Sequence, residues 1–146
     1  MKEDDALPFS KVLIAVDNSE CASRAFDYAV RLSKLAGARI SVIHVIPPVP
    51  ATEGIPVAEL AEDMAKEGEQ LLANIKTRAE IQFGIRVETV LGNGNPSKVI
   101  LATTNDIGAD LIVMGSSGMG GVKEFLLGSV SHAVSNHAQC PVLIVK

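Results

Sequence analysis

The chain has 146 residues and a net charge of −4, with 47% apolar and only 3% aromatic residues. This length suits a single domain over residues 1–146, and the acidic balance gives no broad basic surface for nucleic acid. No apolar run approaches the ~20 residues of a membrane-spanning helix, and none follows the charged N-terminus, so we expect no membrane partner and no signal peptide. Cys21 and Cys140 fit no metal-ligand spacing and are expected to be free thiols in the cytoplasm.

The aliphatic residues fall into a regular succession of segments. Five runs indicate buried strands, at residues 11–17, 38–46, 85–91, 111–114 and 141–146. The partial alternation of the third run favours an edge strand. Apolar residues at helical spacing indicate helices over 22–36, 57–79, 99–107 and 130–137. Asn18 or Ser19 can cap the first helix and Asn95 the third, and Gly37 and Gly108 stop these two helices.

Repeated alternation of strands and helices is typical of an α/β fold with an open parallel sheet and helices on both faces. We expect the five strands in the order 3-2-1-4-5, in which both halves of the chain wind outward from the first strand. Ligands of such sheets bind beyond the carboxyl ends of the strands, where the strand order reverses. Asp17 ends the first predicted strand and Gly115 follows the fourth, so the two residues would meet in one crevice.

A glycine-rich stretch, Gly115–Ser129, connects the fourth strand to the last helix and has the spacing G-x2-G-x9-G-S. It is neither a P-loop, which ends in Gly-Lys-Ser/Thr, nor the dinucleotide fingerprint, which belongs after the first strand. Gly115 and Gly118 lack a Cβ, so the backbone can turn with positive φ and approach a ligand closely. Gly128 can cap the last helix while leaving N–H groups open to a phosphate, and Ser129 adds a hydroxyl. The alternative is a plain connecting loop.

These residues, together with three other segments, closely resemble the universal stress protein family. The resemblance rests on the spacing from Gly115 to Ser129, the first-strand segment 12–19, His44-Val45 and the ending 140–145. The glycine spacing resembles that of the family's ATP-binding branch. The resemblance implies a Rossmann-like fold of the adenine nucleotide alpha hydrolase type. It also implies an ATP-binding module of the stress response or of its regulation.

The resemblance assigns roles to single residues of a nucleotide site. Ala15 and Val45 would wall the adenine, with the Val45 backbone reading its edge. Met114 and Gly115 would flank the nucleotide, and Asp17 would lie at the ribose and phosphate end of the cleft. Backbone or hydroxyl donors to the ribose and phosphates would come from Gly118, Gly128, Ser129 and Val130. The family also implies a homodimer, in which the last strand, Val142–Val145, pairs with its copy.

A metal ion follows from the charges rather than from a ligand motif. Asp17 beside a triphosphate would be a like-charge contact, which is costly in a cleft of low dielectric. Mg²⁺ or Mn²⁺ bridging the phosphates would relieve this repulsion, with Asp17 bound directly or through water. The alternative is that Asp17 only favours the N-terminus of the following helix.

Three functions remain open from the sequence. The first is an ATP-binding module that signals by occupancy, because no Ser-His-Asp, Cys-His or paired-carboxylate set is evident. The second is a slow ATPase or phosphotransferase in which Asp17 and a metal orient a water. The third is an interaction protein that binds no nucleotide, against which the glycine spacing argues. The three histidines show no joint ligand spacing, and Cys21 is expected to be a bystander thiol at a helix start.

Overall fold

The computed structural model describes residues 7–51, 53–117 and 127–146. Its strands are β1 (Lys11–Ala15), β2 (Arg39–Ile46), β3 (Glu88–Asn93), β4 (Leu111–Gly115) and β5 (Val142–Val145). Its helices are α1 (Glu20–Ala36), α2 (Val57–Phe83), α3 (Pro96–Ile107) and α4 (Ser129–His137). The predicted alternation of strands and helices is therefore confirmed element by element.

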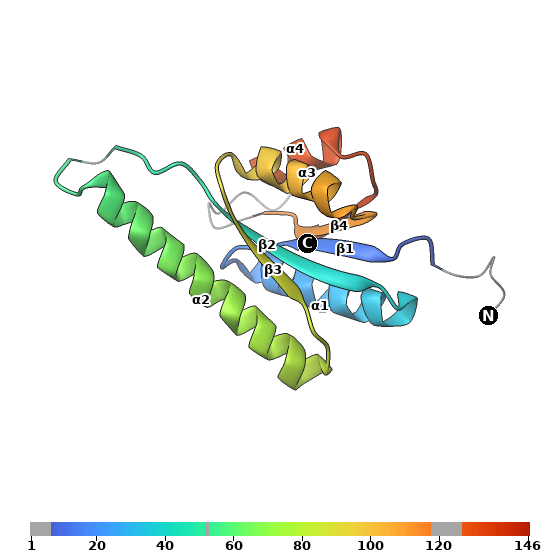
Figure 1. Ribbon diagram of the computed structural model, residues 1–146. Coiled ribbons are helices and arrows are strands. Elements are labelled where there is room, and N and C mark those ends of the chain that lie inside the picture. The colour runs from blue at the N-terminus through green and yellow to red at the C-terminus, as the bar shows by residue number, and fades with distance from the viewer. Residues whose placement is uncertain (1–6, 52, 118–126) are drawn as a thin grey trace.

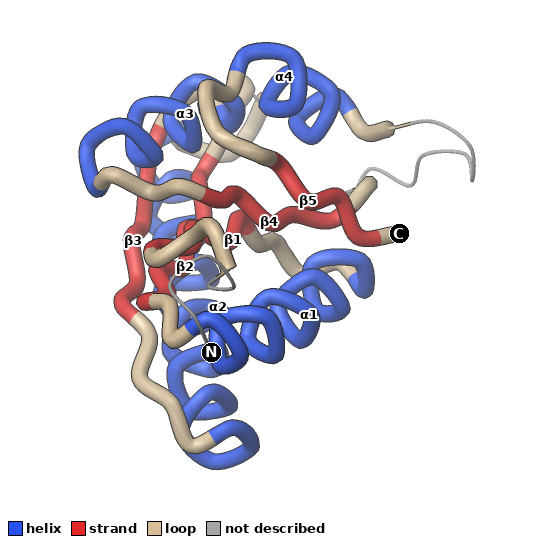
Figure 2. Tube along the Cα trace, turned by 90° about the vertical axis from the view of Figure 1, so that its right-hand side faces the viewer, coloured by secondary structure: helices blue, strands red, loops and turns tan. Residues whose placement is uncertain are grey.

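The five strands form one parallel sheet in the order β3-β2-β1-β4-β5, as expected. Helices α1 and α2 cover one face and α3 and α4 the other, so the sheet is the middle of three layers (Figures 1 and 2). β3 lies at one edge, as its alternation predicted, and β5 lies at the other. The strand order reverses beside β1, which pairs with β2 on one side and β4 on the other.

Side chains of the strands alternate between two apolar layers. Val12 and Ile14 of β1 belong to the layer under α1 and α2, where Phe26 is the largest fully buried side chain. Leu13 and Ala15 belong to the layer under α3 and α4. Because both faces are covered, β1 must be apolar from Val12 to Ala15, which explains why this stretch is a continuous aliphatic run.

Local capping sets the helix ends. The Ser19 hydroxyl accepts a hydrogen bond from the Ala22 N–H at 3.1 Å, so Ser19 rather than Asn18 is the N-cap of α1. The Asn95 side chain caps α3 in the same way at the Lys98 N–H. Gly37 ends α1 in the left-handed conformation, with a φ of 65°, as the sequence predicted.

Two strands, β1 and β3, differ from the sequence prediction by two residues or more, and the other three differ by at most one residue at either end. β1 ends at Ala15, so Asp17 lies beyond the strand instead of ending it. β3 runs from Glu88 to Asn93 rather than over 85–91, because its partner β2 continues to Ile46 and pairs with it as far as Asn93. Gly92 permits this register, since a Cβ there would lie 2.7 Å from a methyl group of Val99.

Within the described part of the chain, no helix is both long enough and apolar enough to cross a membrane. Both cysteines are free, as predicted.

Candidate functional site

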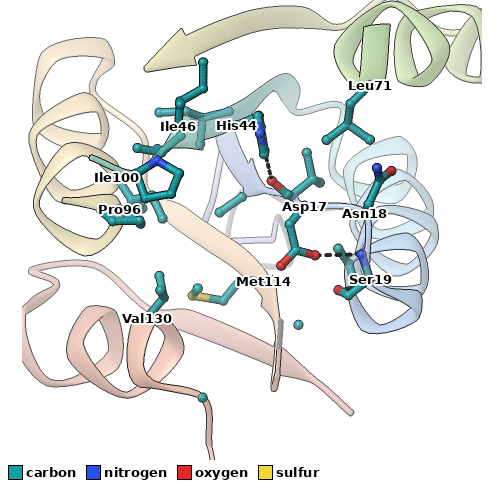
Figure 3. Close-up of a pocket in the computed structure, with 18 of the residues that line it drawn as sticks. Asp17, Asn18, Ser19, His44, Ile46, Leu71, Pro96, Ile100, Met114 and Val130 are labelled. Atoms are coloured by element: carbon teal, nitrogen blue, oxygen red, sulfur yellow. Dashed lines mark hydrogen bonds between the residues drawn. The ribbon is translucent and has the colours of Figure 1, made fainter. Parts of the chain in front are cut away.

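A cleft of about 530 Å³ opens beyond the carboxyl ends of β1, β2 and β4. It lies where the strand order reverses, which is the place where open parallel sheets bind ligands. Asp17 and Gly115 both line it, so the predicted crevice is present (Figure 3). Eight of the nine residues that the sequence assigned to a nucleotide site line this one cleft: Ala15, Asp17, Val45, Met114, Gly115, Gly128, Ser129 and Val130. The ninth, Gly118, lies outside the described residues.

One half of the cleft is apolar. Ala15, Val45 and Met114 rise from the strands and are at most 8% exposed. Ile100 of α3 and Val130 of α4 face them from the helices above (Figure 3). A flat, weakly polar ring suits such walls, because binding there removes apolar surface from water on both sides.

Gly115 has a different structural role from the one the sequence suggested. It is the last residue of β4 and does not have a positive φ. A Cβ there would lie 2.7 Å from the Cβ of Cys21 and 2.9 Å from its carbonyl carbon. Gly115 therefore allows the first turn of α1 to pack directly against the end of β4. The prediction of a turn with positive φ is wrong for Gly115. Gly118 lies outside the described residues, so for that residue it stays a prediction.

The N-terminus of α4 opens into the cleft without a side-chain cap. Gly128 is its N-cap, as predicted, with φ −62° and ψ 159°, and no side chain accepts from the first turn. The Gly128 N–H donates to the Ser116 carbonyl at 2.7 Å, and the Ser131 hydroxyl donates to the same carbonyl at 3.0 Å. The helix start is thus fixed against the segment that follows β4. The first-turn N–H groups at Ser129 and Val130 remain free of intrahelical partners, which makes this end suited to an anion.

Asp17 lies in the loop between β1 and α1 with its carboxylate in the cleft (Figure 3). Its Oδ1 accepts a hydrogen bond from the Ser19 N–H at 2.8 Å, which stabilises the approach to α1. Within the described residues its second oxygen has no hydrogen-bond partner. Asp17 thus supports the helix start with one oxygen and presents the other to the cleft, and its contact with a ligand stays a prediction.

The described residues hold no group of three or more His, Cys, Asp or Glu side chains that could bind a metal. Asp17 is nevertheless a ligand of the kind that Mg²⁺ uses, because this ion is commonly held by one or two carboxylates, water and substrate phosphates. Asp17 Oδ2 is the one carboxylate oxygen that the loop before α1 offers for this. Phosphate oxygens and water would supply further ligands.

Cys21 lies next to the same loop, in the first turn of α1. Its Sγ is 3.6 Å from the Ser117 hydroxyl and 3.8 Å from the Ser116 hydroxyl, and it accepts from Arg24 Nη2 at 3.2 Å. The hydrogen bond from Ser117 is the largest influence and, with the help of Ser116 and Arg24, lowers the pKa of Cys21 despite its partial burial. Burial raises the pKa of Cys140. Cys21 is therefore expected to react faster than Cys140, which corrects the expectation that it is a mere bystander thiol.

Sequence reasoning missed a whole wall of the cleft. Helix α2 contributes Met64, Glu67, Gly68 and Leu71, and β2 contributes His44. The apolar spacing of α2 identified its inner face but not what that face covers beyond the sheet. His44 carried a weak signal, because it directly precedes Val45 at the carboxyl end of a predicted strand. Its side chain points to the opposite face of the sheet from Val45, since neighbours on a strand alternate.

An open parallel sheet with a cleft at the reversal of its strand order defines a Rossmann-like α/β protein. The sequence pattern of the universal stress protein family matches residues 8–146. The chain belongs to the universal stress protein family.

Three known proteins illustrate the relationship. Universal stress protein YxiE of Bacillus subtilis is 39% identical over 148 aligned positions, which cover 94% of this chain and 99% of YxiE. The solved structure of the hypothetical protein MJ0577 has a TM-score of 0.83 and 32% identity, covering 96% of this chain and 97% of that one. A universal stress protein solved in complex with cAMP has a TM-score of 0.72 and 24% identity, covering 94% and 97%, and shares the fold.

Proposed function

We propose that this protein binds an adenine nucleotide, with ATP as the principal ligand, and acts as a nucleotide-dependent module of the stress response. The observation that carries the proposal is the uncapped N-terminus of α4, which opens into a cleft whose other half is apolar. An anion is favoured at such a helix end, and an aromatic base is favoured between the apolar walls. A nucleotide combines both groups in one molecule.

The ligand has one orientation that suits both halves of the cleft. The adenine lies between Ala15 and Val45 near the ends of the strands, and the backbone of Val45 reads its edge. The phosphates lie at Gly128 and Ser129, where the first-turn N–H groups and a hydroxyl donate to them. Met114 and Gly115 flank the nucleotide, and Gly118 and Val130 complete the donor set. The glycine spacing, which is that of the ATP-binding branch, supports this orientation.

A divalent cation accompanies the phosphates in this proposal. Mg²⁺ or Mn²⁺ would take the free oxygen of Asp17, directly or through water, together with phosphate oxygens. The ion would neutralise the like charges that otherwise meet between Asp17 and a triphosphate. The universal stress protein solved with cAMP shares the fold of this chain and itself holds an adenine nucleotide.

Occupancy rather than chemistry is the proposed output. Among the described residues of the cleft, no hydrogen bond joins His44 to a serine or a carboxylate, because its Nδ1 bonds to the Val16 carbonyl. Among the described residues, His44 is therefore not paired with a serine nucleophile. An anion site of fixed backbone donors needs no such group to bind its ligand.

Dimerisation through β5 is part of the same proposal. β5 pairs with β4 on one side and forms the outer edge of the sheet on the other. An open edge strand is a template for pairing with another chain. A second copy that pairs along Val142–Val145 would cover this edge, and sedimentation equilibrium of the purified protein measures whether it does.

The test is calorimetric titration of the protein with ATP, with and without Mg²⁺, for the wild type and Asp17→Asn. Asparagine keeps the acceptor for the Ser19 N–H but removes the charge. With Mg²⁺ the variant should bind about tenfold more weakly, which corresponds to ~1.4 kcal/mol. In chelator the order should reverse, because the wild-type carboxylate then repels the phosphates. The matched control is Asp106→Asn, which removes an exposed carboxylate at the end of α3.

Three outcomes contradict parts of the proposal. No ATP binding at millimolar concentration would mean that the cleft serves another purpose and would revive the interaction protein. An affinity that is insensitive to chelation would remove the metal. Release of phosphate in single turnovers with radiolabelled ATP, lost in Asp17→Ala while binding survives, would favour a slow ATPase.

A further inference from the structure

His44 makes a contact that neither the core nor the proposed nucleotide contacts require. Its ring Nδ1 lies 2.9 Å from the carbonyl oxygen of Val16, the residue immediately before Asp17 (Figure 3). A carbonyl oxygen only accepts hydrogen bonds, so Nδ1 carries the hydrogen and donates it. The contact joins β2 to the loop between β1 and α1 across 28 residues of sequence.

The hydrogen bond from His44 completes the restraint of Val16. The Val16 N–H donates to the Ile43 carbonyl at 2.9 Å. Ile43 and His44 together therefore bond to both backbone polar groups of Val16, its N–H and its carbonyl. On the far side of Asp17, the Ser19 N–H donates to Asp17 Oδ1 at 2.8 Å. Hydrogen bonds therefore restrain both the residue before Asp17 and the Asp17 carboxylate itself. The bond from the Ser19 N–H restricts rotation of the Asp17 carboxylate.

Gly68 of α2 makes room for the ring. A Cβ at Gly68 would lie 3.0 Å from His44 Cδ2 and 2.8 Å from a methyl group of Leu91, closer than carbon atoms pack. The imidazole thus fills the space that a side chain on α2 would take. Gly68 is buried and His44 is half-buried, so the hydrogen bond to Val16 is partly sheltered from water. A sheltered hydrogen bond holds its geometry better than an exposed one.

We propose that His44 is a positioning residue for nucleotide binding, which holds the Val16 carbonyl so that the free oxygen of Asp17 faces the phosphate end of the cleft. Gly68 is the part of α2 that permits this arrangement. The inference rests on the proposed function, because it assigns to His44 an effect on the affinity for ATP. The proposed effect of His44 acts through Asp17 and requires no direct contact of His44 with the metal or the phosphates.

Two substitutions separate the hydrogen bond from the bulk of the ring. His44→Leu replaces the ring with an apolar side chain of similar size and so removes the donor. His44→Asn places an amide N–H close to the position of Nδ1. Loss of one neutral hydrogen bond corresponds to about a three- to tenfold change in an equilibrium constant. We expect His44→Leu to bind MgATP about three- to tenfold more weakly, and His44→Asn to recover most of that loss.

His137→Leu is the matched control. His137 Nδ1 also bonds to a backbone carbonyl, that of Ala133, at 2.9 Å, but it does so at the exposed end of α4 away from the cleft. This variant should keep its ATP affinity within about twofold of the wild type. Far-ultraviolet circular dichroism and thermal unfolding of each variant check that the chain is folded before affinities are compared.

A double-mutant cycle distinguishes positioning from general support of the fold. If His44 acts through Asp17, His44→Leu should cost no further affinity once Asp17→Asn is present. An equal cost in both backgrounds would overturn the inference, as would wild-type affinity in His44→Leu. Nitrogen NMR of the imidazole in the ligand-free protein should find hydrogen on Nδ1, and hydrogen on Nε2 alone would also overturn it. Failure of the wild type to bind ATP would overturn the proposed function and the inference with it.

Discussion

Gly115 permits a sharp test of the packing between α1 and β4. In Gly115→Ala the new Cβ would lie 2.7 Å from the Cβ of Cys21, 2.9 Å from its carbonyl carbon and 3.1 Å from the Ala22 nitrogen. Ordinary contacts between carbon atoms are ~3.5–4.0 Å, so the start of α1 must move. Two of the three atoms belong to the backbone, and the third is a Cβ, so a change of rotamer cannot relieve the contact.

Overpacking of this kind costs ~1–3 kcal/mol of unfolding free energy. For a chain of this size the cost corresponds to a fall of about 3–10 °C in Tm. The assay is urea unfolding followed by circular dichroism, in the absence of nucleotide so that stability and binding are separated. The ATP affinity should fall as well, because a shift in the first turn of α1 moves Ser19, which holds Asp17.

Gly128→Ala is the control within the same glycine spacing. Gly128 has a φ of −62°, and among the described residues its new Cβ would meet no atom closer than 3.4 Å, which is an ordinary contact. Its unfolding free energy should stay within about 0.5 kcal/mol of the wild type. The reasoning is refuted if Gly115→Ala is as stable as the wild type. It is also refuted if Gly115→Ala and Gly128→Ala destabilise the protein to the same extent.

Two further predictions concern titratable side chains. Burial acts to raise the pKa of Asp110, but hydrogen bonds from the Lys11 N–H and from Ser10 outweigh it and hold the pKa below its ordinary value. A lowered folded-state pKa stabilises the protein above the unfolded-state pKa, and this stabilisation is lost as the pH falls through the folded-state value. Asp110→Asn should therefore cost ~1 kcal/mol in urea unfolding at pH 7, and a gap that persists unchanged in strong acid would contradict this. Iodoacetamide at neutral pH should label Cys21 before Cys140, because the pKa of Cys21 is lowered, mainly by the Ser117 hydroxyl, and burial raises that of Cys140. Mass spectrometry of the two tryptic peptides gives the order, and faster labelling of Cys140 would count against it.

The segments of the chain were predictable because their signals are local. Helical spacing, aliphatic runs and the stops at Gly37 and Gly108 depend on neighbours within a few residues. All five strands and four helices were found in this way, with errors confined to their ends. β3 was misplaced because its end is set by its partner β2, which lies about 40 residues earlier and which no local signal reports.

The candidate site was predictable only in part. The positions of Asp17 and Gly115 after two strands indicated a shared crevice, given a strand order that the residues alone did not supply. The wall contributed by α2 was invisible, because an apolar face on a helix does not reveal what it covers. The sequence showed only that His44 shares no ligand spacing with the other histidines, and it did not reveal the contact of His44 with the Val16 carbonyl.

The sequence by itself determined the succession of strands and helices, their capping residues and the glycine spacing before the last helix. Those features follow from backbone preferences and short-range periodicity, which each segment carries within itself. The tertiary structure alone decided why Gly115 must lack a side chain, since the reason is Cys21, 94 positions earlier in the chain. It also decided that Gly68, Val16 and His44 meet. Such contacts arise when distant segments pack together, and the chain carries no local record of them.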